Sequence, residues 1–211
     1  MLDLLTTNPL AFILLLVFLF LSIAIHEFSH AWTANRLGDP TPGLQGRLTL
    51  NPLAHIDMTG MVFLIVFGFG WGKPVMFDPY NLKNPRKDAG LISLAGPLSN
   101  FVIALILSTI IRLFILFKLP ELNIIGSTFF IPLISLNIGL GIFNLLPISP
   151  LDGFKIVGAI LPEDKAHEWY ALERFGLIFL ILLIFPIGNS SMLDMVIRPV
   201  YSFVIRLLLP V

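Results

Sequence analysis

The feature that most limits how this chain can fold is a stretch without a charged residue, from Asn8 to Ile25, that leads directly into His26-Glu27-Phe28-Ser29-His30. An apolar run of this length is typical of a membrane helix, because a helix needs about 20 such residues to cross the hydrocarbon core. Ionisable side chains at membrane depth are costly, and those that occur there usually have a function. The sequence therefore predicts a membrane helix that carries functional ionisable residues near one end.

The composition agrees with a membrane location and excludes several classes of protein. Of the 211 residues, 56% are hydrophobic and 12% are charged, which indicates an integral membrane protein rather than a soluble domain. The 13 basic and 13 acidic residues give no net charge, and no basic run interleaved with aromatic residues suggests nucleic-acid binding. Because the chain has no cysteine, a metal ion would have to be bound by His, Asp or Glu.

Six apolar stretches follow one another along the chain, and five of them are long enough to cross a bilayer. The short one, Met58–Phe69, is bounded by glycines and suits a re-entrant segment that enters the membrane and returns. We expect an α-helical polytopic membrane protein with about five to six transmembrane helices and this re-entrant segment, all in a single domain, 1–211. The other five stretches are Leu10–Trp32, Ala89–Phe117, Phe129–Leu146, Leu172–Ile187 and Met192–Leu209.

A small β-sheet at the membrane surface is also expected. In the segment Gly43–Pro52, Arg47, Thr49 and Asn51 alternate with two leucines, and alternation between Gly and Pro is typical of a short strand. Lys73–Pro79 is the expected partner strand. An exposed edge of such a sheet could hold an extended substrate, with simple anchoring at the surface as the alternative.

The distribution of basic residues predicts the orientation in the membrane, because short cytoplasmic loops hold an excess of Lys and Arg. With five crossings, one re-entrant segment and the amino terminus outside, ten of the 13 basic residues fall inside, including the cluster Lys73–Lys87. Arg206 is one of these ten, and the carboxyl terminus falls inside with it, whereas Arg112, Lys118 and Arg198 are left outside.

The spacing of the two histidines predicts a zinc site. His26 and His30 are four residues apart, so both imidazoles project from one face of a helix, with Glu27 at the edge of that face. In zinc hydrolases with this pattern the two His bind the metal and the Glu acts as general base on the metal-bound water. The alternative, a chance cluster used for proton relay or packing, would place three ionisable groups in hydrocarbon without a cation.

Such a site needs a third protein ligand, and Asp152 is the candidate at the right depth. The segment Asn144–Gly153 ends an apolar helix, and Pro147 and Pro150 interrupt the helical hydrogen bonds where Asp152 enters. If Met58–Phe69 re-enters, His30 and Asp152 both lie near the inner face, whereas a full crossing would separate them.

These residues together resemble the site-2 proteases, the intramembrane zinc metalloproteases. The resemblance rests on the His-Glu-Phe-Ser-His helix, Gly46–Asp57, Ala95–Asn100, Asn144–Pro147 and Leu151–Gly153. It implies one Zn²⁺ per chain held by His26, His30 and Asp152, with Glu27 as general base on the zinc-bound water. It also implies that Asn144 binds the substrate carbonyl or oxyanion, and Asn100, buried in an apolar helix, is a further candidate for substrate binding.

The chain is similar to the small bacterial or archaeal type without a PDZ or CBS domain. This similarity implies a multi-pass protein of the prokaryotic cell (inner) membrane with its active site toward the cytoplasm.

The expected function is therefore hydrolysis of peptide bonds in transmembrane substrates, either in regulated intramembrane proteolysis or in the removal of signal-peptide remnants. The expected partners are a transmembrane-segment protein or peptide and the lipid bilayer, with no nucleic acid. One alternative is a transporter in which His26, His30 and Asp152 pass an ion, but this leaves Glu27 without a role. The other is a catalytically silent relative that only binds membrane partners, although every group that catalysis requires is present.

Overall fold

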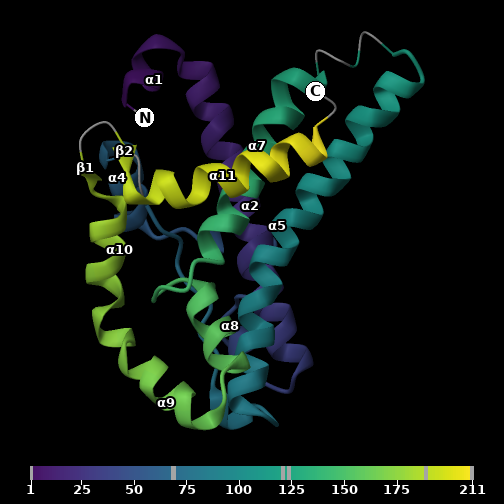
Figure 1. Cartoon of the computed structure of the whole chain (residues 1–211). Helices are drawn as coiled ribbons and strands as arrows, with labels where there is room; N and C mark the ends of the chain where they lie inside the picture. The colour runs from purple at the N-terminus through teal and green to yellow at the C-terminus, as the bar shows by residue number, and fades with distance from the viewer. Residues whose placement is uncertain (1, 68–69, 120–121, 123–124, 188–189, 210–211) are drawn as a thin grey trace.

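The computed structural model describes residues 2–67, 70–119, 122, 125–187 and 190–209. These residues form a mainly helical protein (Figure 1). Its α-helices are α1 (Leu2–Thr7), α2 (Pro9–Arg36), α3 (Thr41–Leu44), α4 (Met58–Phe67), α5 (Pro85–Leu116), α7 (Ile131–Asn144), α8 (Asp152–Ile160), α9 (Glu163–Ala171), α10 (Gly176–Ile184) and α11 (Met192–Leu208). Single turns are η1 (Pro52–Ala54), η2 (Pro79–Asn81), the π-helical η3 (Gly126–Phe130) and η4 (Glu173–Phe175), and β1 (Pro186–Ile187) pairs antiparallel with β2 (Ser190–Ser191).

Within the described part of the chain, three helical segments are long and apolar enough to cross a membrane: α2, α5 and the segment Gly126–Asn144 that joins η3 to α7. The start of α2 follows from its sequence, because the Asn8 side chain accepts the Ala11 N–H and Pro9 takes the first helical position. Only about a fifth of the most apolar window of α2, and of α5, is buried inside the protein. The remaining apolar side chains suit contact with lipid, as expected of an integral membrane protein.

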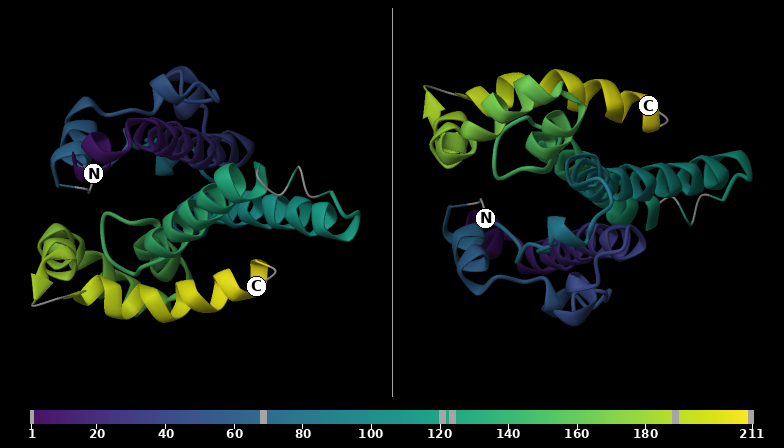
Figure 2. Two further views of the ribbon diagram at one scale, coloured as in Figure 1. Left: turned by 90° about the horizontal axis from the view of Figure 1, so that it is seen from above. Right: turned by 90° about the horizontal axis from the view of Figure 1, so that it is seen from below.

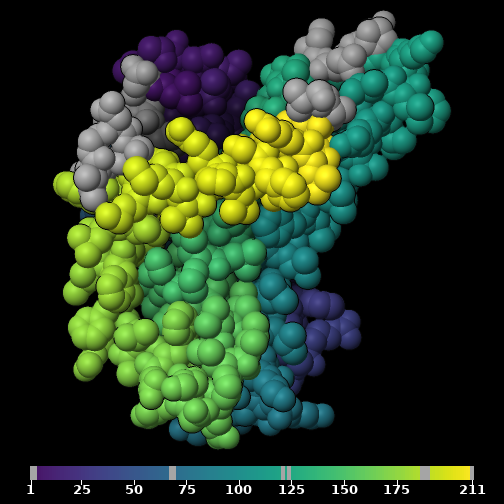
Figure 3. All heavy atoms as spheres, viewed as in Figure 1, coloured from purple at the N-terminus to yellow at the C-terminus, as the bar shows by residue number. Residues whose placement is uncertain are grey.

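The expectation of five to six transmembrane helices is wrong for the last two apolar stretches. Within Leu172–Ile187 the helix α10 has only nine residues, about 14 Å, before the chain turns at Pro186. Within Met192–Leu209 the helix α11 has 17 residues and carries Asp194, Arg198 and Arg206. It packs across α7 and lies over this face of the molecule in Figure 3, where it is yellow.

The expectation of a small surface sheet formed by Gly43–Pro52 and Lys73–Pro79 is also wrong. No residue of these two described segments pairs as a strand, and the nearest β pairing is an isolated bridge just outside them, Ile56 to Gly72. The side chains that suggested a strand instead bond to nearby backbone, which competes with pairing between strands. Arg47 donates to the Ala54 carbonyl, Thr49 Oγ1 accepts the Asn51 N–H, and Asn51 Oδ1 accepts the Leu53 N–H.

The two ends of the segment around α4 lie side by side. Lys73 N–H donates to the His55 carbonyl at 2.8 Å, next to the bridge between Ile56 and Gly72. Asp57 Oδ1 accepts the Gly60 N–H at 2.8 Å and so stabilises the first turn of α4. This is the geometry of a hairpin rather than of a crossing; Gly68 and Phe69, at the end of the expected segment, lie outside the described residues.

The carboxyl-terminal end of α11 does not lie beside the basic start of α5, where the charge argument placed it. Arg112 Nη2 donates to the carbonyls of Leu207 and Leu208, at 2.9 and 3.0 Å. Arg112 is near the end of α5, in the half of the helix opposite Arg86. The end of α11, which carries Arg206, therefore lies near the opposite end of α5 from Arg86, and the expectation that Arg206 shares a face with Arg86 is wrong.

The helix α5 is the common neighbour of α2, α7 and α8. Figure 2 shows α2 and α11 on opposite sides of the molecule, with α5 and α7 between them. The main core cluster lies between α5 and α7 and consists of Ala104, Ile111, Ile134, Ile138 and Ile142, with side chains of α11 packed over it. Because α2 and α8 both pack on α5, residues far apart in sequence meet beside this helix.

Candidate metal centre

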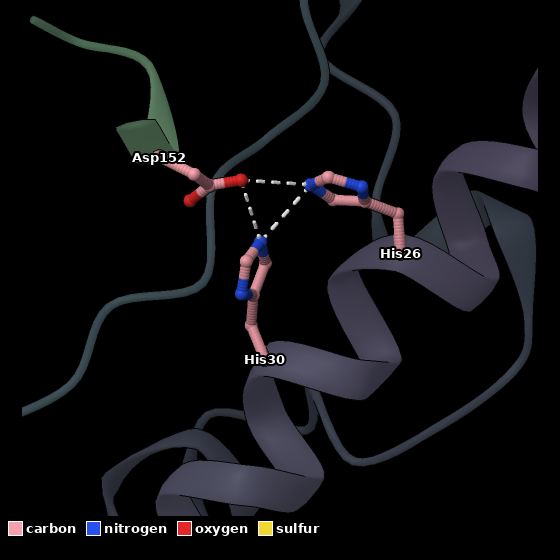
Figure 4. A group of neighbouring side chains, drawn as sticks. All are labelled: His26, His30 and Asp152. Carbon is pink, nitrogen blue, oxygen red and sulfur yellow. Dashed lines mark hydrogen bonds and ion pairs between the residues drawn. The ribbon is translucent and has the colours of Figure 1, made fainter. Parts of the chain in front are cut away.

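His26, His30 and Asp152 lie together where α2 faces the start of α8 (Figure 4). The two Nε2 atoms are 3.0 Å apart, and each is 3.2 Å from Asp152 Oδ2. Atoms around a tetrahedral zinc ion with bonds of about 2.0–2.1 Å are separated by about 3.3 Å. The triangle of two nitrogens and one oxygen therefore has the size of one face of a zinc coordination sphere.

The hydrogen bonds of the imidazoles also suit a cation. His30 Nδ1 lies 2.6 Å from the carbonyl of Ile92, which can only accept, so Nδ1 carries the proton and Nε2 of the neutral ring presents a lone pair. The residues His26 and His30 are 6% and 8% exposed, so little water can separate these groups. Two lone pairs and a carboxylate that face one another in a buried site repel unless a cation lies between them, and the residues present therefore fit a zinc ion.

The position of Asp152 follows from the break between α7 and α8. The chain cannot continue α7 through Pro147 and Pro150, and α8 begins at Asp152 itself. The next residue, Gly153, lies so close to the end of α7 that an added Cβ would be 2.2 Å from the carbonyl oxygen of Leu145. Only glycine permits this approach, which returns the carboxylate to α2.

Gly96 on α5 has a comparable role beside the imidazoles. A Cβ at this position would lie 2.3 Å from His30 Nε2 and 2.5 Å from His26 Nε2, the two atoms that face Asp152. The sequence indicated that the motif around Gly96 belongs to the family pattern, but not that Gly96 lies against the two imidazoles. In the structure, the missing side chain leaves the space in which the two imidazoles converge.

Glu27 and Asn144 border the same site. Both line a cavity of about 120 Å³ that also contains His26, His30 and Asp152. Glu27 Oε2 accepts the Val75 N–H at 3.0 Å, which fixes the orientation of its carboxylate. Asn144 Nδ2 donates to the Leu140 carbonyl of its own helix at 2.9 Å, which leaves its second amide hydrogen for another acceptor.

Asn100 has different surroundings from those expected of a residue that binds substrate. It is 0% exposed, its Oδ1 lies 2.6 Å from His26 Nδ1, and its Nδ2 donates to Asn137 Oδ1 at 2.8 Å. Its side chain is thus engaged at both ends behind the imidazole of His26. Asn100 is not among the residues that line the cavity.

Several neighbours of the site were missed from the sequence. Asn137 and Ser22 continue the hydrogen bonds from Asn100, and a polar residue in an apolar helix was the available signal. Val75 acts through its backbone N–H, for which side-chain patterns carry no signal. Lys155 also lines the cavity, with its Nζ 4.8 Å from the centre of the Phe77 ring.

Comparisons with known proteins agree with this chemistry. The profile of Peptidase family M50 matches residues 14–121 and 116–183. Two relatives carry the name "Putative zinc metalloprotease". YwhC of Bacillus subtilis is 37% identical over 83% of this chain and 82% of its own length. Rip2 of Mycobacterium tuberculosis is 31% identical over 84% of this chain and 70% of its own length. Zinc metalloprotease MJ0392 of Methanocaldococcus jannaschii is 26% identical over 76% of this chain and 38% of its own length. No solved structure matches the chain.

Proposed function

The chain belongs to Peptidase family M50, and from this premise we propose that it is an intramembrane zinc metalloprotease. The observation that carries the proposal is the triangle of His26 Nε2, His30 Nε2 and Asp152 Oδ2, with sides of 3.0 to 3.2 Å. These three side chains would hold one zinc ion per chain. The family match favours hydrolysis over the alternatives of ion transport and of a silent relative.

Zinc in this position would supply Lewis-acid chemistry, which polarises a carbonyl group and can lower the pKa of water to about 7. We assign proton transfer to Glu27, which follows His26 directly and borders the same cavity. The bond from the Val75 N–H to its Oε2 orients the carboxylate, and we propose that the free Oε1 would take a proton from water and pass it to the leaving amine.

Asn144 is proposed to bind the substrate carbonyl. It lines the cavity beside Asp152, and one hydrogen of its Nδ2 remains after the bond to Leu140. A donor in this place would stabilise negative charge that develops on the carbonyl oxygen during attack. We do not propose such a part for Asn100, which is fully buried behind His26.

The proposed substrates are transmembrane segments of other proteins, because the site lies beside helices that suit a lipid bilayer. His26 is ten residues before Arg36, the end of α2, which places it about 15 Å from the basic end of that helix. The same end of the molecule carries the basic start of α5, with Arg86 and Lys87. By the positive-inside rule we propose that this end faces the cytoplasm of a prokaryotic cell and that residues 1–211 act as a single domain.

Glu27→Gln tests the proposal most directly. This change keeps the shape of the side chain and removes its ability to accept a proton, so we expect zinc content equal to that of the parent and loss of at least about 100-fold in cleavage rate. The measurement is cleavage of a reconstituted transmembrane peptide, with zinc determined on the same samples. Parental cleavage rates in Glu27→Gln would refute the role of Glu27.

A further inference from the structure

A chain of buried hydrogen bonds extends from His26 through three helices. His26 Nδ1 pairs with Asn100 Oδ1 of α5 at 2.6 Å, and Asn100 Nδ2 donates to Asn137 Oδ1 of α7 at 2.8 Å. Asn137 Nδ2 donates to Ser22 Oγ of α2 at 2.9 Å and to the Leu133 carbonyl at 2.9 Å. Asn100 and Asn137 are 0% exposed and Ser22 is 1% exposed, so water cannot readily replace any of these partners.

A backbone carbonyl at the far end of this series of hydrogen bonds determines which group donates in each of them. The carbonyl of Leu133 can only accept, so the amide nitrogen of Asn137 must face it and Oδ1 of Asn137 must face α5. Asn100 must then present its Nδ2 to Asn137 and its Oδ1 to His26. His26 must therefore donate from Nδ1, which leaves the lone pair of the neutral ring on Nε2.

The position of Ser22 reinforces this order. Its hydroxyl donates to the Phe18 carbonyl at 2.8 Å, so its oxygen can accept from Asn137. Ser22 lies one turn before His26 on the same helix, and the chain of bonds thus begins and ends on α2. A closed connection of this kind restricts both the rotation of the imidazole and the shift of α2 against α5 and α7.

We propose that Asn137 and Ser22 are positioning residues that hold His26 in its metal-binding tautomer and orientation through Asn100. The inference rests on the proposed function only in that the bound ion is zinc. Partners that hydrogen-bond a metal ligand typically contribute tenfold to hundredfold to metal affinity or activity. Neither residue touches the cavity, so their effect reaches the site through His26.

The test compares purified parent and Asn137→Ala by two measurements that need no substrate. Nitrogen NMR of histidine-labelled, metal-free protein should show His26 protonated at Nδ1 in the parent and a mixture of both tautomers in Asn137→Ala. Zinc affinity, measured by competition with a chelator, should fall by about 10-fold or more. Ser22→Ala leaves the bond from Asn137 to the Leu133 carbonyl in place, and its zinc affinity should fall about threefold to tenfold. This variant serves as the test if Asn137→Ala does not fold.

The control is Ser108→Ala, which removes another buried hydroxyl bond in a membrane helix, from Ser108 to the Leu208 carbonyl, remote from His26. It should keep parental zinc affinity and the parental tautomer. An unchanged His26 tautomer in both network variants, or an equal loss of zinc affinity in Ser108→Ala, would overturn the inference. A parent that binds zinc with this dependence on Asn137 but cleaves no membrane segment would support the inference and contradict the proposed function.

Discussion

At the scale of single residues, the space around the imidazoles depends on Gly96 as much as on the ligands themselves. A methyl group there would lie 2.3 to 2.5 Å from both Nε2 atoms, and α5 cannot retreat because α2, α7 and α8 all pack on it. We expect Gly96→Ala to bind zinc at least about 10-fold more weakly, because the two imidazoles can no longer converge. Chelator competition on purified protein measures this.

The matched control is Gly139→Ala on α7, where an added Cβ would meet nothing within 4 Å. This variant should bind zinc like the parent and be slightly more stable, since alanine favours a helix by up to about 1 kcal/mol. Parental zinc affinity in Gly96→Ala would show that the site adjusts and that the glycine is not required.

The acidic residue Asp39, in the loop after α2, gives a prediction for pH. Burial of this carboxyl opposes ionisation, but the Thr41 hydroxyl, the backbone N–H groups of Asp78 and Thr41, and the Asn81 amide all donate to it, and together they lower its pKa below the ordinary 3.8. A carboxyl with a lowered pKa stabilises the fold above its unfolded pKa, and this stability is lost as pH falls through the folded pKa.

We therefore expect the thermal unfolding midpoint of the parent to fall as pH decreases below about 4. The unfolding midpoint of Asp39→Asn should be lower than that of the parent at pH 7 and should fall less as the pH decreases. The difference between the two proteins contains the contribution of the Asp39 carboxylate. Parallel curves for the two proteins would contradict this role of Asp39.

At the scale of elements, the break between α7 and α8 should be sensitive to Gly153. A Cβ at Gly153 would collide with the carbonyls of Leu145 and Leu146 and push the start of α8, with Asp152, away from α2. We expect Gly153→Ala to lower zinc affinity while the two histidines are unchanged. Again Gly139→Ala is the control, and unchanged zinc affinity in Gly153→Ala would indicate that α8 can shift without loss of the site.

The sequence predicted the parts of the site that depend on regular spacing. His26 and His30 share a helix face by their separation alone, and the prolines before Asp152 indicated where α7 stops. Hydrogen bonds that join separate helices, such as those from Asn137 to Asn100 and to Ser22, could not be predicted, because they depend on how α7 packs against α5 and α2.

The wrong predictions of the fold also have physical reasons. Apolar length alone suggested that Met192–Leu209 crosses the membrane, but its apolar residues serve two purposes. One set, including Ile197, Tyr201 and Val204, packs against the cluster between α5 and α7. Others, such as Met195 and Phe203, remain exposed. A count of apolar residues does not distinguish a helix that crosses lipid from one that covers a bundle.

At the scale of the whole molecule, the absence of cysteine from the sequence permits a direct test of orientation. Tyr80, before α5, is 97% exposed, and Leu116, at its far end, is 70% exposed. In intact cells we expect an impermeant maleimide to label Leu116→Cys and not Tyr80→Cys, because the basic end of α5 is proposed to face the cytoplasm. Permeabilised cells should label both, and labelling of Tyr80→Cys alone in intact cells would reverse the orientation.

X-ray absorption at the zinc edge of the purified protein shows whether α2 and α8 share one zinc ion. We expect one zinc per chain with two imidazole nitrogens and one carboxylate oxygen at about 2.0–2.2 Å. A zinc shell with a single imidazole, or a purified chain that binds no zinc, would contradict it.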